Sequence, residues 1–324
     1  MVGRALWLAS LVCTVATPAW AFDCAKAQAP VEKAICTNPA AKAADEAMEG
    51  AFGAVRDGLQ GDERRAVLAD QRAWLKKRNA RCGEPQAGSA RCLADADADR
   101  VRALTGEAAA GPGLPRRPVP VFVAQAGGVG RTEVAVRVYR FPNPASPGER
   151  AVNAQAETRL AAIPFKADDA DDPGQRGVAN WGHDEFWTIS YASPRFVSIR
   201  RDTWDFTGGA HGSSGTGGVT VDWATGRVLT FRDLFDPPAR VEFDRACLGQ
   251  ITAARKERGA DAQPVAATLK AIAPVVSDLT NWVFTGAGAT VFFDPYVLGS
   301  YAEGTYTCEL PAARIERLAK LPVR

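Results

Sequence analysis

Few side chains in this sequence are equipped for chemistry, and the histidines are the first to consider. Histidine occurs only as His183 and His211 among 324 residues. Ser213 follows His211 closely, but a serine hydrolase also needs a strained turn such as G-x-S-x-G and a third triad member, which we do not find. A metal site built from both histidines would need a carboxylate such as Asp184 or Asp205, and nothing in the spacing makes these residues converge. We therefore expect no enzyme activity, no metal and no cofactor.

The loop around His211 is rich in glycine and serine. Gly208 and Gly209 allow a sharp backbone path just before the histidine. Two interpretations stay open. The imidazole is buried and caps the turn with hydrogen bonds, or the loop projects as a binding loop with His211 and Ser213 at its tip.

An acidic stretch offers a second set of candidate side chains. Its carboxylates are Asp168, Asp169, Asp171 and Asp172. The spacing resembles the start of a calcium-binding loop, but Pro173 fills a ligand position and Asn180 stands where the bidentate glutamate belongs. The sequence therefore predicts a solvated acidic loop rather than a calcium site.

The first residues predict export. Met1 to Arg4 form a short basic segment, Ala5 to Ala16 form an apolar run, and Ala19-Trp20-Ala21 fits a cleavage site. The apolar run is shorter than the ~20 residues that span a bilayer. We expect cleavage after Ala21 and a mature chain, in the periplasm or secreted, that does not insert into a membrane.

Cysteine content agrees with an oxidising compartment, because removal of the signal takes Cys13 away and leaves an even number. The remaining cysteines are Cys24, Cys36, Cys82, Cys92, Cys247 and Cys308. They fall into a cluster of four and a distant pair, so we expect disulfides within each group and none between the groups.

Charge and length narrow the function and the domain count. There are 39 basic and 37 acidic residues, which gives no field for attracting nucleic acid. About 300 mature residues favour two domains. Residues 106–118 read GEAAAGPGLPRRP and are typical of a linker. We therefore divide the chain into a signal at 1–21, domains at 22–105 and 119–324, and this linker.

Residues 22–105 predict a small helical bundle. Asn38-Pro39 is a helix start, and apolar residues recur at helical spacing up to Leu59. Antiparallel packing of the two long helices would bring Cys82 beside Cys36. We therefore expect Cys24 and Cys36 to pair with Cys82 and Cys92, in an order that the sequence leaves open.

The second long helix carries Gln71, Trp74 and Arg78 on one face. These side chains are either ligand contacts or packing residues. In the packing interpretation, which we favour, Arg78 stacks on the indole or pairs with a carboxylate such as Asp45 or Glu49.

Residues 119–324 change to a mixed pattern. Alternating residues predict a strand near 134–138. We expect further strands near 186–191, 196–206, 290–293 and 305–310, with helices near 241–257 and 266–279. Residues 219–223 and 227–231 predict a hairpin. The pattern indicates an α+β fold with an antiparallel sheet, in which Cys247 ties a helix to the last strand at Cys308.

The front module resembles the LprI-like lysozyme-inhibitor family. The matching elements are Phe22-Asp23-Cys24, Glu32 to Cys36, the Gln71-to-Cys82 motif, and Cys92-Leu93 followed by Arg100 and Leu104. Phe52 and Asp97 depart from that pattern, and Asp97 replaces a tyrosine that is usual on the last helix. The resemblance implies an interaction with lysozyme.

The rear domain resembles the RsiV/PdaC-type C-terminal domain, over about residues 180–315. The matching strings are Thr207 to Gly212, Thr225 to Phe235, Phe293 to Tyr296 and Gly299 to Gly304. That domain occurs on a lysozyme-sensing anti-sigma factor and as an accessory part of a peptidoglycan deacetylase. Without a preceding membrane span, sigma-factor control does not carry over.

Both resemblances imply the same partner, lysozyme. The leading hypothesis is an exported protein that binds and inhibits c-type lysozyme through a set of candidate contacts. These contacts are His211, Ser213, Asp168, Asp169, Asp171, Asp172, Tyr296 and Tyr301. One alternative is a non-catalytic peptidoglycan-binding protein, for which Trp181, Trp187 and Trp204 would stack on sugars. The third hypothesis is a hydrolase of envelope glycans.

Overall fold

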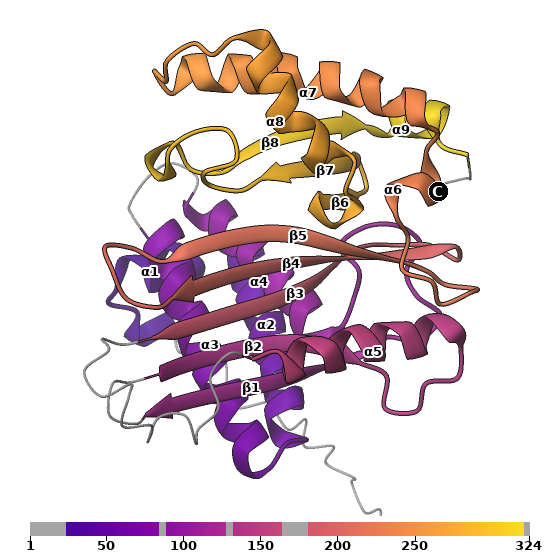
Figure 1. Cartoon of the computed structure of the whole chain (residues 1–324). Helices are drawn as coiled ribbons and strands as arrows, with labels where there is room; N and C mark the ends of the chain where they lie inside the picture. Colours follow the sequence, from indigo (N-terminus) through magenta and orange to yellow (C-terminus); the bar gives the residue numbers. More distant parts are fainter. Residues whose placement is uncertain (1–23, 84–88, 128–131, 164–180, 321–324) are drawn as a thin grey trace, which may run out of the picture.

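The computed structural model describes residues 24–83, 89–127, 132–163 and 181–320. The predicted export signal and the acidic loop with Asp168, Asp169, Asp171 and Asp172 lie outside the described residues. In Figure 1, helices lie behind a five-stranded sheet, one helix crosses in front of it, and a second sheet with its own helices lies beyond β5. The chain is an α+β protein, as predicted.

The front module consists of helices joined by short connections. They are α1 (Pro30–Thr37), α2 (Pro39–Asp57), α3 (Gly61–Cys82) and α4 (Ser89–Thr105), preceded by a 3-10 turn at Cys24–Lys26. The predicted start of α2 is present: the Asn38 side chain accepts a hydrogen bond from the Ala41 backbone N–H at 3.0 Å.

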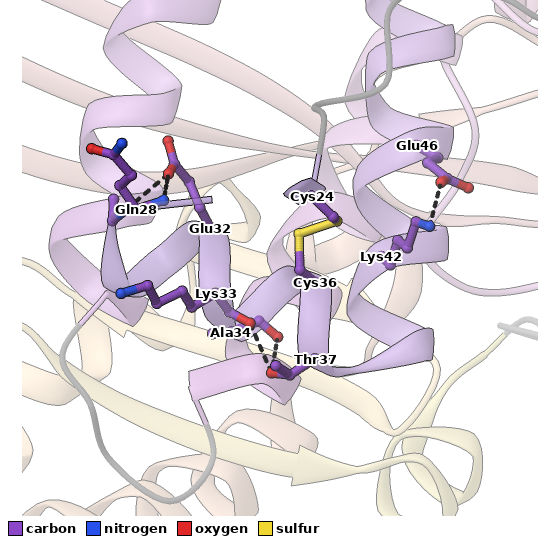
Figure 2. The surroundings of a disulfide bond; sticks show 10 residues. Cys24, Gln28, Glu32, Lys33, Ala34, Cys36, Thr37, Lys42 and Glu46 are labelled. Carbon is purple, nitrogen blue, oxygen red and sulfur yellow. Dashed lines mark hydrogen bonds and ion pairs between the residues drawn. A yellow bond between two sulfur atoms is a disulfide. The ribbon is translucent and has the colours of Figure 1, made fainter. Parts of the chain in front are cut away.

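The predicted disulfide pattern of this module is wrong. Cys24 bonds to Cys36 and Cys82 bonds to Cys92, each pair with a Cα–Cα distance of 5.6 Å. Figure 2 shows the first bond joining the 3-10 turn to the end of α1. Cys82 does pack in one apolar cluster with Ile35, next to Cys36 in the chain. Cys92, in the first turns of α4, belongs to the same cluster, so each bond joins cysteines only 12 or 10 residues apart instead of linking α1 to α3.

The main sheet has the strand order β1-β2-β3-β4-β5. Its strands are β1 (Val119–Gly127), β2 (Thr132–Arg140), β3 (Gly182–Ala192), β4 (Phe196–Phe206) and β5 (Ser213–Asp222). Neighbouring strands are antiparallel except β2 and β3, which run parallel. A parallel pair needs a crossover, which α5 (Pro147–Ala161) provides.

Helix α5 packs on one face of the main sheet. Its Val152 and Ala156 contact a cluster that includes Val136, Trp187 and Ile189. This helix was not predicted. Its start signal is nevertheless present in the sequence, because Ser146 and Glu149 form a reciprocal capping box.

The second sheet is antiparallel and lies beside β4 and β5. Its strands are β6 (Trp282–Thr285), β7 (Gly288–Phe293) and β8 (Tyr306–Pro311), and its helices are α6 (Phe231–Leu234), α7 (Pro237–Glu257), α8 (Val265–Val276) and α9 (Ala312–Leu318). The Cys247–Cys308 disulfide forms as predicted, between α7 and β8. The Phe284 ring on β6 packs edge-on against Phe196 on β4, which joins the two sheets.

The predicted hairpin at 219–231 forms, but its second arm is shorter than expected. The Asp222 N–H donates to the Arg227 carbonyl and the Leu229 N–H donates to the Thr220 carbonyl, each at 2.8 Å, around an antiparallel bridge between Val221 and Val228. The chain then turns into α6, because Thr230 and Asp233 form a capping box at its start. A helix-start signal therefore overrides the strand-like run of apolar residues.

The front module packs against the other face of the main sheet. Ala66 and Val67 of α3 and Leu104 of α4 share an apolar cluster with Phe122 of β1. The Tyr139 hydroxyl of β2 donates to the Ala103 carbonyl at 3.1 Å. The two parts of the chain therefore share a buried interface that the sequence did not indicate.

The predicted linker at 106–118 is also attached to this sheet. The Ala109 N–H donates to the Ile189 carbonyl at 2.8 Å, and the Ala192 N–H donates to the Ala110 carbonyl at 3.0 Å. Ala108 and Leu114 pack against the cluster under α5. The segment lacks helix and strand but is held along β3 rather than spanning solvent.

Candidate functional site

Two loops bring an aromatic cluster together at the surface. His211, in the connection from β4 to β5, stacks on Tyr301 with ring centroids 3.6 Å apart and planes 13° apart. Tyr296, from the loop after β7, contacts the same imidazole. These three residues, which we call the His211 cluster, were predicted from separate stretches of sequence, and the fold makes them neighbours.

Hydrogen bonds define how the His211 ring is held. Its Nδ1 lies 3.0 Å from the Gly212 carbonyl, and its Nε2 lies 3.3 Å from the Tyr296 hydroxyl. Since a carbonyl only accepts, the neutral ring fits with its hydrogen on Nδ1, which leaves Nε2 to accept from Tyr296. His211 is exposed. The interpretation of a projecting loop therefore fits better than that of a buried cap.

The backbone under the His211 cluster is strained and well anchored. Tyr296 has φ +74°, a region that non-glycine residues seldom adopt. Arg255 of α7 donates to the Leu298 carbonyl at 2.5 Å and pairs with Glu303 at 2.8 Å. These bonds hold the loop on both sides of the partly buried Tyr301, so the cluster is preorganised.

The other predicted contacts do not join this cluster. Ser213 is exposed as the first residue of β5, and among the described contacts it does not meet His211. The four aspartates lie outside the described residues. Gly208 and Gly209 have φ +95° and +101°, conformations that explain glycine at both positions.

The tryptophans expected to stack on sugars differ in exposure. Trp187 is fully buried under α5, and its Nε1 donates to the Glu185 carboxylate at 2.7 Å. Its predicted role in sugar stacking is therefore wrong, because a β-strand places alternate residues on the packed face. Trp204 is exposed, and Trp181 is partly buried.

A second polar cluster surrounds His183 on the face that α5 covers. His183 Nδ1 lies 2.6 Å from Asp205, and Glu185 pairs with Arg159 of α5 at 2.6 Å. The sequence reasoning missed this cluster because it did not predict α5. In the described part of the chain, no three metal-binding side chains gather, and the two histidines have different partners.

The motif of α3 is directed into the core. Arg78 pairs with Asp45 at 2.8 Å and with Asp97 at 2.6 Å, and its guanidinium lies 5.2 Å from the Trp74 ring centroid. Gln71 accepts a hydrogen bond from Arg100 at 2.9 Å. These contacts support the packing interpretation of the motif.

Asp97 and Arg100 show what the sequence reasoning missed in this network. Asp97, the departure from the family pattern, is fully buried against Arg78, and Arg100 bonds to Asp70 at 2.6 Å. Their spacing of three residues on one helix face was the available signal. We did not predict carboxylates on the inner face, because buried charges are rare unless paired.

Burial also affects a carboxyl beside this network. Burial, with help from the Asp45 charge, raises the pKa of Glu49 from 4.5 to about 7, and Arg78 opposes the shift only in part. One carboxyl oxygen of Glu49 is buried without a hydrogen-bond partner among the described residues. In the folded chain, the Glu49 carboxyl group is therefore mainly protonated below about pH 7.

This raised pKa predicts that stability falls with rising pH. Between pH 4.5 and about 7 the folded state holds a proton that the unfolded state releases, so the free energy of unfolding decreases across that window. Discounted for solvent screening, the loss is ~1 kcal/mol, and the thermal midpoint should fall by about 2–4 °C from pH 5 to pH 7.5.

Glu49→Gln should flatten that dependence, whereas Glu46→Gln, an exposed neighbour on the same helix, should leave it unchanged. Thermal melts of the parent and both variants at the two pH values measure it. An identical slope in all three proteins would show that Glu49 is ionised in the folded state.

Two family models match separate parts of the chain. Residues 24–104 match the family described as lysozyme inhibitor LprI. This match confirms the resemblance inferred for the front module, which we now call the LprI-like module. Residues 232–313 match the family described as a protein of unknown function, DUF3298, a shorter span than the resemblance predicted.

Solved structures of DUF3298 proteins are similar to the chain. One from Bacteroides fragilis has 14% identity and a TM-score of 0.46, and covers 63% of this chain and 93% of its own. One from Pseudomonas aeruginosa has 18% identity and a TM-score of 0.45, and covers 64% of this chain and 99% of its own. The search of curated proteins found no match. Within the described ranges, no helix has both the length and the apolar character needed to cross a bilayer.

Proposed function

We propose that this protein is exported and that it binds and inhibits c-type lysozyme, in the periplasm or outside the cell. The observation that supports the proposal most is the LprI match, over nearly all of the module. The disulfides fit an oxidising compartment. The DUF3298 family is described as one of unknown function. We propose that the part of the chain that matches it, residues 232–313, binds a partner rather than catalyses a reaction.

The exposed surfaces are the candidate contacts with lysozyme. The inner face of the LprI-like module is occupied by its own ion pairs, so Gln71, Trp74 and Arg78 have little to offer a partner. The His211 cluster is anchored, two of its three rings, His211 and Tyr296, are exposed, and aromatic residues are enriched at interface hot spots. We place the lysozyme contact at His211, Tyr296, Tyr301 and Ser213.

Electrostatics suggests a second contribution. Lysozyme is a basic protein whose cleft holds two carboxyl groups, one of which is protonated as the general acid. We propose that Asp168, Asp169, Asp171 and Asp172 attract its outer surface. Replacing all four with Asn should slow association and weaken its salt dependence, because exposed charges steer encounter.

A lysis assay tests the proposal directly. Lysozyme acting on bacterial cells should be inhibited in proportion to the added chain. His211→Ala should speed dissociation about fivefold to thirtyfold, as loss of a contact worth ~1–2 kcal/mol would. Val265→Ala, an exposed apolar residue at the start of α8, is the matched control.

The results of these assays show whether the chain binds lysozyme and which part of it makes the contact. If the chain leaves lysis unaffected and shows no binding in a biosensor, the lysozyme proposal is refuted. If His211→Ala binds like the parent, the His211 cluster is not the contact, and the outer surface of the LprI-like module takes its place.

A further inference from the structure

A flat aromatic surface lies at the end of the main sheet, next to the His211 cluster but separate from it. Trp204, near the end of β4, has its indole over two glycines on either side. A Cβ on Gly182 of β3 would lie 2.7 Å from the ring, and a Cβ on Gly212 before β5 would lie 2.4 Å from it. The absence of side chains at both positions lets the indole lie flat across the sheet.

Phe206 extends this surface. Its ring is stacked with that of Trp204 at 15° between planes and 6.0 Å between centroids. Trp204 is 39% exposed, a large fraction for an indole that packs on backbone. None of the described residues accepts a hydrogen bond from its Nε1, so a donor is left at the edge of the surface.

The surface lies between two parts of the chain. On β3, Asp184 pairs with Trp204 in the strand register and is bound by Lys77 of α3 at 3.4 Å. On the other side, Gly212 leads to His211, which stacks on Tyr301. Polar side chains therefore border a flat apolar centre.

We propose that Trp204 and Phe206 form a stacking platform for the pyranose rings of a glycan. One face of a pyranose carries C–H groups, whose partial positive charge suits the negative face of an aromatic ring. The hydroxyl groups at the ring edge can reach the indole N–H and the polar border.

Preorganisation of the Trp204 indole also favours glycan binding. The two glycines and the parallel Phe206 ring fix the indole before a ligand arrives, so little side-chain entropy is lost on binding. The inference goes beyond lysozyme binding, because its partner is a polysaccharide. A protein with both sites would be held at the glycan that lysozyme attacks.

Titration calorimetry of the purified chain with a soluble tetramer of β-1,4-linked N-acetylglucosamine tests the platform. The parent should bind the tetramer. Trp204→Ala should weaken binding about tenfold or more, and Trp204→Phe, which keeps a ring, should retain most of it. Val265→Ala should bind like the parent, and thermal melts confirm that each variant is folded.

Two results would overturn the inference. One is a parent chain that binds neither the tetramer nor purified peptidoglycan sacculi. The other is Trp204→Ala binding the tetramer like the parent. A parallel lysozyme assay separates the two proposals, since Trp204→Ala should still inhibit. Loss of inhibition by Trp204→Ala, without glycan binding by the parent, would make the platform a protein contact.

Discussion

Asp70→Ala should destabilise the folded chain by about 3–5 kcal/mol, since it removes the one carboxylate that lies between two buried guanidinium groups. Asp70 lies 2.6 Å from Arg100 of α4 and 3.5 Å from Arg137 of β2. Arg100 is 1% exposed and Arg137 is 7% exposed, so water cannot replace the lost partner.

Denaturant unfolding of the parent and the variant measures the effect. Asp62→Ala, on the exposed first turn of the same helix, should cost less than about 1 kcal/mol. Adding Arg137→Met to Asp70→Ala should recover part of the loss, because it removes one of the unpaired charges. Equal midpoints for Asp70→Ala and Asp62→Ala would mean that the interface between the LprI-like module and the sheet is hydrated.

The disulfides should differ in their contribution to stability. Cys247 and Cys308 are fully buried and 61 residues apart in sequence, whereas Cys24 and Cys36 are 12 apart. In the chain-entropy account, closing the longer loop constrains the unfolded chain by about 4 kcal/mol and closing the shorter one by about 3 kcal/mol.

We therefore expect Cys247→Ser with Cys308→Ser to lower stability more than Cys24→Ser with Cys36→Ser. Burial of two hydroxyl groups in an apolar core adds to the difference. Chemical denaturation of both double variants under oxidising conditions compares them. A larger loss for the Cys24 and Cys36 pair would indicate that the local turn, rather than loop closure, determines the contribution.

Local signals in the sequence were sufficient for most elements. Asn38 predicts the start of α2, and the alternation at Val134, Val136 and Val138 predicts β2, because capping and side-chain alternation depend only on residues close in sequence. The same kind of signal at Ser146 was overlooked, and with it α5. The missed helix explains two errors at once, the unexpected parallel pair and the missed His183 cluster.

Contacts between distant segments were harder to predict. No residue pattern near Tyr139 or Phe122 predicts that the LprI-like module packs against these side chains. Similarly, Tyr296 and Tyr301 meet His211 only because the loop after β7 is bound to β5, where the Thr216 N–H donates to the Asp294 carboxylate. Residue types suggested these side chains, but only the fold gives their distances. The predicted disulfide pairing was wrong for the opposite reason, because the cysteines pair with partners only 12 and 10 residues away rather than across the bundle.

The parallel pair of β2 and β3 has a consequence for how the chain folds. Hairpins can assemble β1 with β2, and β3 with β4 and β5, from residues close in sequence. Joining these two units requires α5 to cross first, and the LprI-like module can dock fully only on the joined sheet. Because distant pairing slows folding, we expect the joining step to limit the rate. Until the two units join, β2 and β3 present open strand edges. A second copy of the chain that has not finished folding could pair with these edges.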